Sequence, residues 1–261
     1  MQKYFDIAQK AAKAAGKIIK NNFHKKKNVS YKGRIDLVTD IDKRAEDAII
    51  QILKNNFPDH NILTEESDFA RDDRSEYCWV IDPLDGTTNY VHEFPFVNVS
   101  VALQKSKESI VGVVFNPILD EFFYAIKGRG SYKNEQRLVV SQSTELKKSV
   151  LATGFPYEMK GERNNLDNFN KIIKECRGVR RPGAAALDLC YVAAGIFDGF
   201  WEMELHPWDT AAGILIVEEA GGKIAKFDGA EFSIFDKEIV ATNGKIHEKL
   251  INILGGIIKS G

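Results

Sequence analysis

Two aspartates three residues apart follow a short apolar run. They lie in a segment whose Pro and Gly residues favour a turn. Asp82 and Asp85 belong to Asp-Pro-Leu-Asp-Gly-Thr-Thr-Asn, residues 82–89. This segment comes directly after Trp-Val-Ile, residues 79–81, which we expect to form a strand that stops at Asp82. Carboxylates this close repel each other unless a proton or a cation lies between them, and such oxygen ligands suit Mg²⁺. We expect a helix to begin at Gly86 and Thr87, where the free N–H groups of the first turn can hold a phosphate. The segment therefore predicts a cation site beside an anion site, although a plain N-capped turn would use the same residue types.

Three other acidic segments have ordinary explanations when each is taken alone. Glu65 and Glu66 follow Asn-Ile-Leu-Thr, and paired acids at the end of a strand are usually solvated. Asp209 precedes an Ala-rich apolar helix and suits its N-cap, and the acids of residues 36–42 suit the N-cap region of an earlier helix. Each of these segments is therefore weak evidence for a site by itself.

Together the four segments resemble the inositol monophosphatase family of Mg²⁺-dependent, Li⁺-sensitive phosphatases. The family segments D-P-[LI]-D-G-T-x-N, W-D-x-A-x-G, E-A-G-G, G-E-E and D-x-V-T-x-x-D match residues 82–89, 208–213, 219–222, 64–66 and 36–42. Their order and spacing fit from one end of the chain to the other. Two features depart from the family pattern, namely Thr64, where Gly or Ser is usual, and the short, charged segment 67–77. These departures leave the substrate preference open and do not weaken the predicted reaction.

The resemblance implies that two or three Mg²⁺ ions bind in the active site. The implied ligands are four carboxylates and one carbonyl oxygen, those of Glu65, Asp82, Asp85 and Asp209 and that of Leu84. Asp82 would bridge two ions, while Asp85 and Asp209 would hold the second. Phosphate monoesters hydrolyse very slowly in water, and metal ions supply both an activated water and charge stabilisation. This chemistry needs no Cys or His nucleophile, in agreement with the absence of such a motif.

The same resemblance implies roles for the residues around the ions. Thr87, together with Glu65, would position the attacking water and help to deprotonate it. Asp42 would support the site as a neighbouring acid, and Asp40 would be a minor helper. The backbone N–H groups of Gly86 and Thr87 would hold the phosphate, beside Leu84 and Asp85, which also contact the substrate. We expect the histidines His92 and His206 only to pack or hydrogen-bond near the site.

The substrate implied by the resemblance is a small phosphorylated polyol, with inositol 1-phosphate first. Glu202 and Asp209 would contact the polyol, and the backbone at Gly183, Ala184 and Ala185 would meet it at the start of a helix. Taken alone, these small residues would only indicate a tight contact between a helix and a sheet.

Two other functions stay open at this point. If Arg180 or Arg181 reached a second phosphate, the enzyme would be a fructose-1,6-bisphosphatase or would accept both substrates, with histidinol phosphate and 3′-phosphonucleotides further behind. A different class is a regulatory binding protein with a structural metal site. Thr87 argues against that class, because a structural metal site has no use for it.

The elements that must position these residues follow from periodicity and turn residues. Apolar residues at helical spacing predict helices over 3–23 and from about 42 to 56, with a loop or hairpin over the basic tract 24–34. Three strand-like runs over 97–128 predict an antiparallel meander. After residue 145 we expect strands and helices to alternate, with strands at 149–154, 197–203, 223–227 and 238–243 and helices at 163–176, 184–194, 210–220 and from 247.

The fold class is mixed α+β and α/β, and the resemblance implies a layered αβαβα sandwich. We expect an N-terminal half, 1–145, with most metal ligands, and a C-terminal half, 146–261, with Asp209, in one catalytic unit.

The composition describes a globular protein and excludes several other classes. The chain has 261 residues, 44% of them apolar, and a formal net charge of −1. This balance argues against broad affinity for nucleic acid or membranes, and a local RNA contact through residues 25–34 stays open. The three cysteines are too scattered for a disulfide framework, and the Lys-containing N-terminus is neither a signal peptide nor a membrane span. We therefore expect a cytoplasmic protein, and the resemblance implies a homodimer.

Overall fold

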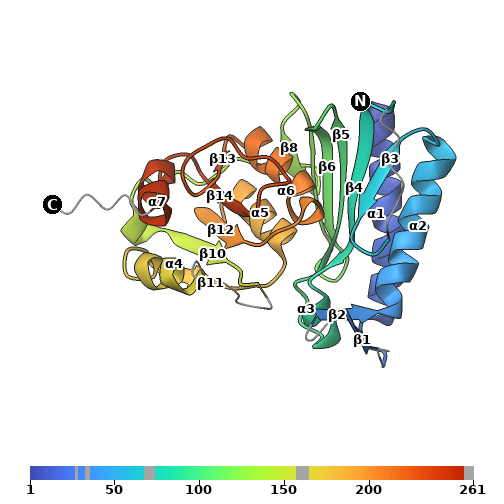
Figure 1. Cartoon of the computed structure of the whole chain (residues 1–261), viewed down its shortest axis with the longest axis horizontal. Helices are drawn as coiled ribbons and strands as arrows, with labels where there is room; N and C mark the ends of the chain where they lie inside the picture. Colours follow the sequence, from blue (N-terminus) through green and yellow to red (C-terminus); the bar gives the residue numbers. More distant parts are fainter. Residues whose placement is uncertain (27–28, 33–35, 68–73, 157–164, 256–261) are drawn as a thin grey trace.

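The structure is a computed structural model that describes residues 1–26, 29–32, 36–67, 74–156 and 165–255, without the side chains of 29–32 and 36–38. Its elements form five layers (Figure 1). Two outer helices, α1 (Gln2–Asn22) and α2 (Asp40–Asn56), cover a seven-stranded sheet. The helices α5 (Ala185–Ala193) and α6 (Pro207–Glu219) lie between this sheet and a five-stranded sheet, and α4 (Asn165–Ile172) and α7 (His247–Leu254) form the last layer. The expected αβαβα sandwich is confirmed.

The first sheet has the order β3-β4-β5-β6-β7-β8-β9. Its strands are β3 (Asn61–Thr64), β4 (Tyr77–Asp85), β5 (Asn98–Lys105), β6 (Glu108–Asn116), β7 (Glu121–Ile126), β8 (Ser131–Lys133) and β9 (Gln136–Arg137). The strands β5 to β7 form the antiparallel meander that the sequence predicts, and β8 and β9, which it does not predict, extend it. The strand β3 runs parallel to β4. The expected hairpin in the basic region is present as β1 (Val29–Lys32) paired with β2 (Asp36–Thr39). Residues 27–28 and 33–35 of this region lie outside the described residues.

The second sheet has the order β11-β10-β12-β14-β13. Its strands are β10 (Val150–Thr153), β11 (Gly178–Arg180), β12 (Gly199–Met203), β13 (Lys223–Ala225) and β14 (Glu238–Thr242), preceded by a short 3₁₀ helix, η1 (Leu146–Lys148). The sequence does not predict β11, and the helix expected over 163–176 ends earlier, at Ile172. A turn follows Ile172 and leads the chain into β11, and residues 163–164 lie outside the described part.

The strand β4 is longer than the sequence predicts. The prediction ended it before Asp82, but pairing with β5 continues to Asp85 opposite Asn98, with an irregular register between Asp82 and Asp85. Pro83 lies inside this irregular stretch and has no N–H for a ladder bond, so the pairing opens there. Gly86 then turns the chain at φ 88°, and the short helix α3 (Thr87–Val91) begins. The two aspartates therefore lie in a bulged strand end and not in a free loop.

The helix α6 is docked onto the first sheet, although the sequence places it in the second half. A Cβ atom on Gly112 of β6 would lie 2.7 Å from the Ala212 carbonyl oxygen, so only a glycine allows this approach. The hydroxyl of Ser109 donates to the Ala211 carbonyl oxygen over 2.8 Å. The middle layer thus packs against both sheets, and its first turn lies near the end of β4.

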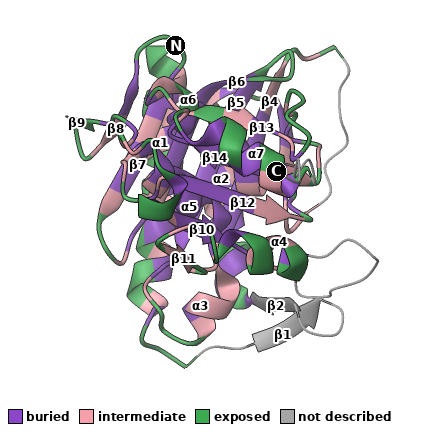
Figure 2. Ribbon diagram, turned by 90° about the vertical axis from the view of Figure 1, so that its left-hand side faces the viewer, coloured by how far each residue is buried: buried purple, intermediate pink, exposed green. Residues whose placement is uncertain are grey.

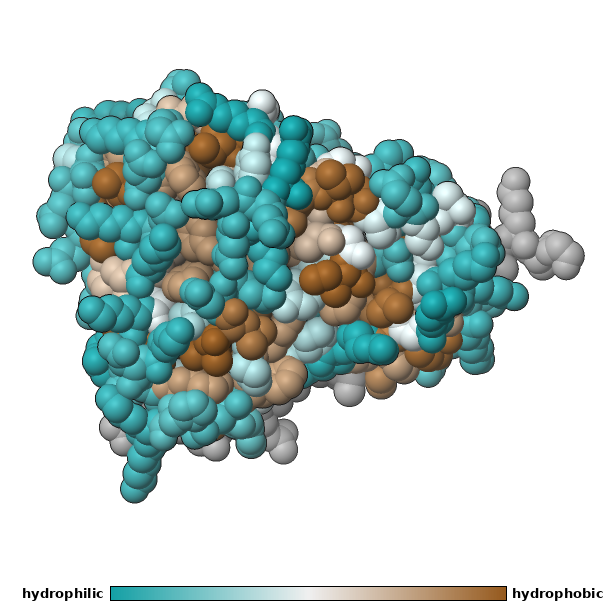
Figure 3. All heavy atoms as spheres, turned by 180° about the vertical axis from the view of Figure 1, so that it is seen from behind, coloured by the Kyte–Doolittle hydropathy of each residue, from teal (hydrophilic) through white to brown (hydrophobic). Residues whose placement is uncertain are grey.

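Three clusters of buried apolar side chains fill the spaces between the layers. One lies between the outer helices α1 and α2 and the first sheet, one around α5 and α6, and one between the second sheet and α4 and α7. Figure 2 shows the central strands mostly in purple, while α4 and α7 carry exposed green faces. The face opposite to that of Figure 1 is mainly hydrophilic with separate hydrophobic patches (Figure 3). Within the described residues, no helix combines the length and apolar character needed to cross a bilayer.

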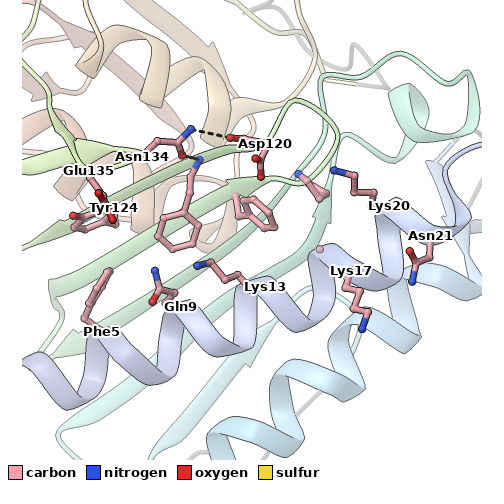
Figure 4. Close-up of a pocket in the computed structure, with 14 residues that line it drawn as sticks. Phe5, Gln9, Lys13, Lys17, Lys20, Asn21, Asp120, Tyr124, Asn134 and Glu135 are labelled. Atoms are coloured by element: carbon pink, nitrogen blue, oxygen red, sulfur yellow. Dashed lines mark hydrogen bonds between the residues drawn. The ribbon is translucent and has the colours of Figure 1, made fainter.

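A hollow of about 690 Å³ lies between α1 and the hairpins of the first sheet (Figure 4). Phe5 and Tyr124 contribute aromatic rings to it, and Lys13 and Lys17 project from α1 along its edge. None of the residues that the sequence predicts for catalysis or binding lines this hollow. The predicted residues lie elsewhere, where β4 and the middle layer meet.

Candidate active site

The two aspartates of β4 have different surroundings. Asp82 is buried, and its Oδ1 accepts a hydrogen bond of 3.0 Å from the N–H of Leu84. The Oδ2 of Asp85 accepts hydrogen bonds of 2.8 Å from the amide of Asn98 and of 3.0 Å from the N–H of Ala186. Because Ala186 belongs to the first turn of α5, Asp85 links β4 to the middle layer. Sequence reasoning missed Asn98, the buried first residue of β5.

The hydroxyl of Thr87 lies between a carboxylate and a carbonyl oxygen. Its Oγ1 is 3.2 Å from Oδ1 of Asp42 and 3.2 Å from the Leu84 carbonyl oxygen. The other oxygen of Asp42 accepts from the N–H of Thr39 at 2.9 Å and from its hydroxyl at 2.6 Å, which makes the capping box of α2. Burial raises the pKa of Asp42, and these hydrogen bonds oppose the rise. In contrast, Asp40 is half exposed and pairs with Arg44 at 3.6 Å.

A buried carboxylate that the sequence analysis missed holds the segment around Glu65. Glu46 of α2 accepts hydrogen bonds from the hydroxyls of Thr64, at 2.7 Å, and Ser67, at 2.6 Å. Glu65 lies between these two anchors, at the end of β3, which runs parallel to β4. The signal that could have revealed Glu46 is its position one helical turn after Asp42. Thr64, a departure from the family pattern, has a structural role here as a donor.

Asp209 is the third residue of α6 and not its N-cap, which is His206, and the His206 backbone fixes the Asp209 carboxylate. Its Oδ2 accepts a hydrogen bond of 2.7 Å from the N–H of His206, and the His206 Nδ1 is 3.6 Å away. The His206 ring stacks on Trp208 with the ring centroids 5.0 Å apart. His92 is exposed at the end of α3. The geometry gives His206 a packing and hydrogen-bonding position, as expected.

Four acidic groups, from β4, α6 and the segment after β3, lie close enough for their charges to interact. Burial raises the pKa of Asp82 well above its usual value, and the negative charges of Glu65, Asp85 and Asp209 raise it further. Burial also raises the pKa of Asp85 to about 7, with Asp209 as the next cause. Among the described residues, no three acidic, His or Cys side chains form a preassembled ligand group. The buried, all-oxygen donor set nevertheless fits a hard divalent cation, because a cation would offset this repulsion.

The residues expected at the polyol lie on the other side of these acids. Glu202 of β12 is half-buried, and burial raises its pKa to about 8, with Asp209 and Asp85 contributing and Arg181 opposing. Gly183 has φ 87°, and Ala184 is the N-cap of α5. The structure therefore brings Glu202 and the Gly183–Ala185 backbone to the same region as Asp85 and Asp209.

The sequence analysis assigned no role to two further polar residues in this region. The amide of Asn89 donates to the carbonyl oxygens of Phe96 and Pro182, both at 2.8 Å, and so ties α3 to the segment before α5. Asp188 of α5 is buried, and neither carboxylate oxygen has a hydrogen-bond partner among the described residues. Burial raises the pKa of Asp188 strongly, and the charge of Glu202 adds to the effect. The sequence does not reveal the surroundings of Asp188, because the neighbouring charges come from other elements.

The chain is similar to known proteins along nearly its whole length. Residues 1–259 match the model of the inositol monophosphatase family. Inositol monophosphatase 2 of Solanum lycopersicum is 43% identical over 261 residues, which covers 97% of this chain and 98% of that protein. A fructose-1,6-bisphosphatase/inositol-1-monophosphatase of Aquifex aeolicus is 41% identical, covering 97% and 96%. The solved structure of an inositol monophosphatase from Anabaena (Nostoc) sp. PCC 7120 superposes with a TM-score of 0.90 at 41% identity, covering 98% of this chain and 96% of that chain.

Proposed function

Since the chain belongs to the inositol monophosphatase family and is a phosphoric monoester hydrolase, we propose that its main substrate is inositol 1-phosphate and its cofactor Mg²⁺. Members of this family are generally Mg²⁺-dependent. The observation that supports the proposal most is the group of mutually repelling acids Glu65, Asp82, Asp85 and Asp209 beside the Thr87–Asp42 pair. A buried group of this sign destabilises the fold unless it binds a cation.

Five oxygen donors would hold two or three Mg²⁺ ions in this proposal. They are the carboxylates of Glu65, Asp82, Asp85 and Asp209 and the carbonyl oxygen of Leu84. When bound, Mg²⁺ supplies charge stabilisation for the phosphate and for the leaving oxygen. The hydrogen bonds from Asn98 and Ala186 to Asp85 Oδ2 orient the Asp85 carboxylate. The peptide N–H of Leu84 engages Oδ1 of Asp82 in the same way, so each aspartate is oriented by the backbone before a ligand arrives.

Thr87 is proposed to position the attacking water. A hydroxyl has one proton to donate, and Asp42 is an ionisable acceptor for it at 3.2 Å. With its proton directed to Asp42, Thr87 presents lone pairs that accept a hydrogen bond from water. Glu65 would take the proton as the water attacks, and the N–H groups of Gly86 and Thr87 would hold the phosphate.

The polyol would lie against Glu202 and the start of α5. Glu202 and Asp209 would accept hydrogen bonds from its hydroxyls, and the backbone of Gly183, Ala184 and Ala185 would contact its carbon ring. Gly183 fits this role because its φ of 87° is a conformation that glycine adopts without strain.

A bisphosphate substrate is the second candidate, and one observation favours it. The guanidinium of Arg181 would lie 3.2 Å from a Cβ on Gly183, and its charge opposes the pKa rise of Glu202. Arg181 thus has its cationic end beside the proposed polyol space, where a second phosphate could be bound. If so, Arg181→Ala should lower kcat/KM for fructose 1,6-bisphosphate by about tenfold or more, which is the effect of losing one charge-assisted hydrogen bond. The kcat/KM for inositol 1-phosphate should stay unchanged.

We also propose a homodimer, which would cover an apolar surface next to α5. The exposed ring of Phe94 leads to Phe96 and Tyr191, with successive ring centroids 6.5 and 5.3 Å apart. Val139 and Ile196 are also exposed, and the backbone of residue 139 lies against that of residue 195. A second copy of the chain would bury these side chains. Ile196→Glu should then shift the mass measured by light scattering from dimer to monomer.

The experiment that tests the proposed function is phosphate release from inositol 1-phosphate with and without Mg²⁺. The wild type should turn over only with Mg²⁺, and Asp85→Asn should abolish turnover because it removes a carboxylate charge from the metal site. Asp47→Asn is the matched control, since Asp47 is an exposed residue of α2. If Asp85→Asn kept wild-type turnover, the proposed metal site would be wrong. If the wild type hydrolysed only the bisphosphate, the second candidate would replace the first.

A further inference from the structure

The carboxylate of Glu202 lies directly on the backbone of Gly154. Gly154 follows β10, and Glu202 lies on the adjacent parallel strand β12, where Thr153 pairs with Trp201. A Cβ atom on Gly154 would overlap all three heavy atoms of the Glu202 carboxylate group. Gly154 does not have a positive φ, so its backbone conformation is open to any residue. The reason for glycine at this position is therefore the Glu202 carboxylate.

The backbone of Gly154 cannot move away from Glu202 at low cost. The amide of Asn165 donates to the Gly154 carbonyl oxygen at 2.5 Å, and the Trp201 indole N–H donates to Asn165 at 2.7 Å. The hydroxyl of Thr153 donates to the Trp201 carbonyl oxygen at 2.7 Å. These groups are buried, so breaking one of the bonds would leave an unpaired polar group. A side chain at position 154 would thus displace the end of the Glu202 side chain and not the two strands.

We propose that Gly154 is a positioning residue that makes the site selective for polyhydroxylated phosphate esters. This inference rests on the proposed function, in which Glu202 accepts hydrogen bonds from the substrate hydroxyls. Because Gly154 leaves room for its carboxylate, Glu202 can offer its acceptors from this position before the substrate binds, which avoids an ordering cost. The metal-binding acids are on other elements, so a change at 154 alters polyol recognition and leaves phosphate binding intact.

The test compares a polyol ester with an ester that lacks hydroxyls. Gly154→Ala should raise KM for inositol 1-phosphate about tenfold, the size of one charge-assisted hydrogen bond, and leave kcat nearly unchanged. For phenyl phosphate, KM should stay within about twofold, because that substrate has no hydroxyl for Glu202. Gly178→Ala is the matched control in the same sheet, where the added Cβ meets only the flexible Arg180 guanidinium. It should leave both KM values unchanged.

A second variant separates displacement of Glu202 from general damage to the fold. Glu202→Asp shortens the side chain by one methylene and vacates the space that a Cβ at 154 needs. The double variant Gly154→Ala/Glu202→Asp should therefore bind inositol 1-phosphate better than the product of the two single effects predicts. If Gly154→Ala failed to fold, thermal unfolding would be measured on the double variant. Recovery of folding in that variant would also show that the Cβ at 154 and the Glu202 side chain compete for the same space. Independent effects of the two substitutions would overturn the inference.

The two proposals fail in different ways. A wild type that releases phosphate from neither ester would refute the proposed function. A wild type that hydrolyses both, with Gly154→Ala raising both KM values equally or neither, would refute the role of Gly154 alone. Glu202→Gln with unchanged discrimination between the esters would also refute it, because Gly154 acts through Glu202.

Discussion

The hydroxyl of Thr87 lies 3.2 Å from the carboxylate of Asp42, although 45 residues separate them in the chain. The two belong to the first turns of α3 and α2, and Asp42 also caps its own helix through Thr39. One oxygen of the Asp42 carboxylate thus caps helix α2, and the other accepts a hydrogen bond from the Thr87 hydroxyl. The stability of α2 and the orientation of Thr87 are therefore coupled through Asp42.

Removing the hydroxyl of Thr87 should damage turnover more than folding. Thr87→Val keeps the shape of the side chain but cannot accept a hydrogen bond from the attacking water, so kcat should fall by about 10²–10⁴. Thr87→Ser keeps the hydroxyl and should retain activity within about tenfold. Steady-state kinetics on inositol 1-phosphate and thermal unfolding of both variants check this. Equal kcat values for the Val and Ser variants would contradict the role given to Thr87.

Loss of one acid should stabilise the protein when no metal is bound. Asp82 is buried beside three other carboxylates, so Asp82→Asn removes repulsion and should raise the unfolding midpoint measured in the presence of a chelator. The wild type should gain about 2–4 kcal/mol from saturating Mg²⁺, while the variant gains far less. Calorimetry with chelator and with Mg²⁺ measures both effects. Equal Mg²⁺ responses of the two proteins would argue against Asp82 as a ligand.

The anchor formed by Glu46 should matter for both stability and turnover. Thr64→Val removes the donor at 2.7 Å and leaves a buried carboxylate oxygen unpaired, which should cost about 1–3 kcal/mol in the free energy of unfolding. Because Glu65 is the next residue, kcat should fall as well. Thr64→Ser retains the hydroxyl and should approach the wild type in both measurements. Denaturant unfolding together with kinetics would expose a purely structural role, in which stability falls and kcat does not.

Buried His247 should make the protein less stable in mild acid. Its Nδ1 lies 2.9 Å from the Thr242 hydroxyl, and burial lowers its pKa in the folded state. The unfolded chain then binds a proton more readily, so the contribution of His247 is fully present above its unfolded pKa of about 6.5 and is lost as the pH falls below it. The difference in unfolding free energy between wild type and His247→Gln should therefore shrink from pH 7.5 to pH 5.5, about one unit on either side of that value. A difference that stays constant with pH would mean that His247 does not titrate differently on folding.

The contiguous parts of the site could be predicted from the sequence, and its long-range contacts could not. Asp82 and Asp85 stand in one short segment with their turn residues, so their types and spacing are readable directly. Asn98 contacts Asp85 only because β5 pairs with β4 in a register that places the two residues opposite each other. Glu46 reaches Thr64 in a similar way, through packing of α2 on β4 and β3.

Long elements were predicted better than short ones for a related reason. The helices α1 and α2 repeat their apolar pattern over several turns, which a sequence reveals. The strands β8 and β11 have three residues each, too few for a period, and form because a neighbouring strand is already in place. The extension of β4 beyond Ile81 was missed because Pro83 usually ends a strand, whereas here it lies in a bulge.

The shared middle layer has a consequence for how the chain folds as it is synthesised. The inner face of the first sheet is complete when residue 137 has been made, but α5 and α6, which cover it, end at residues 193 and 219. At about 5–20 residues per second, that face waits several seconds for its cover. The nascent chain therefore presents an apolar sheet surface during this interval, and a fragment that stops near residue 145 would keep it permanently. Chaperone dependence of this protein should accordingly be greatest just before α6 leaves the ribosome.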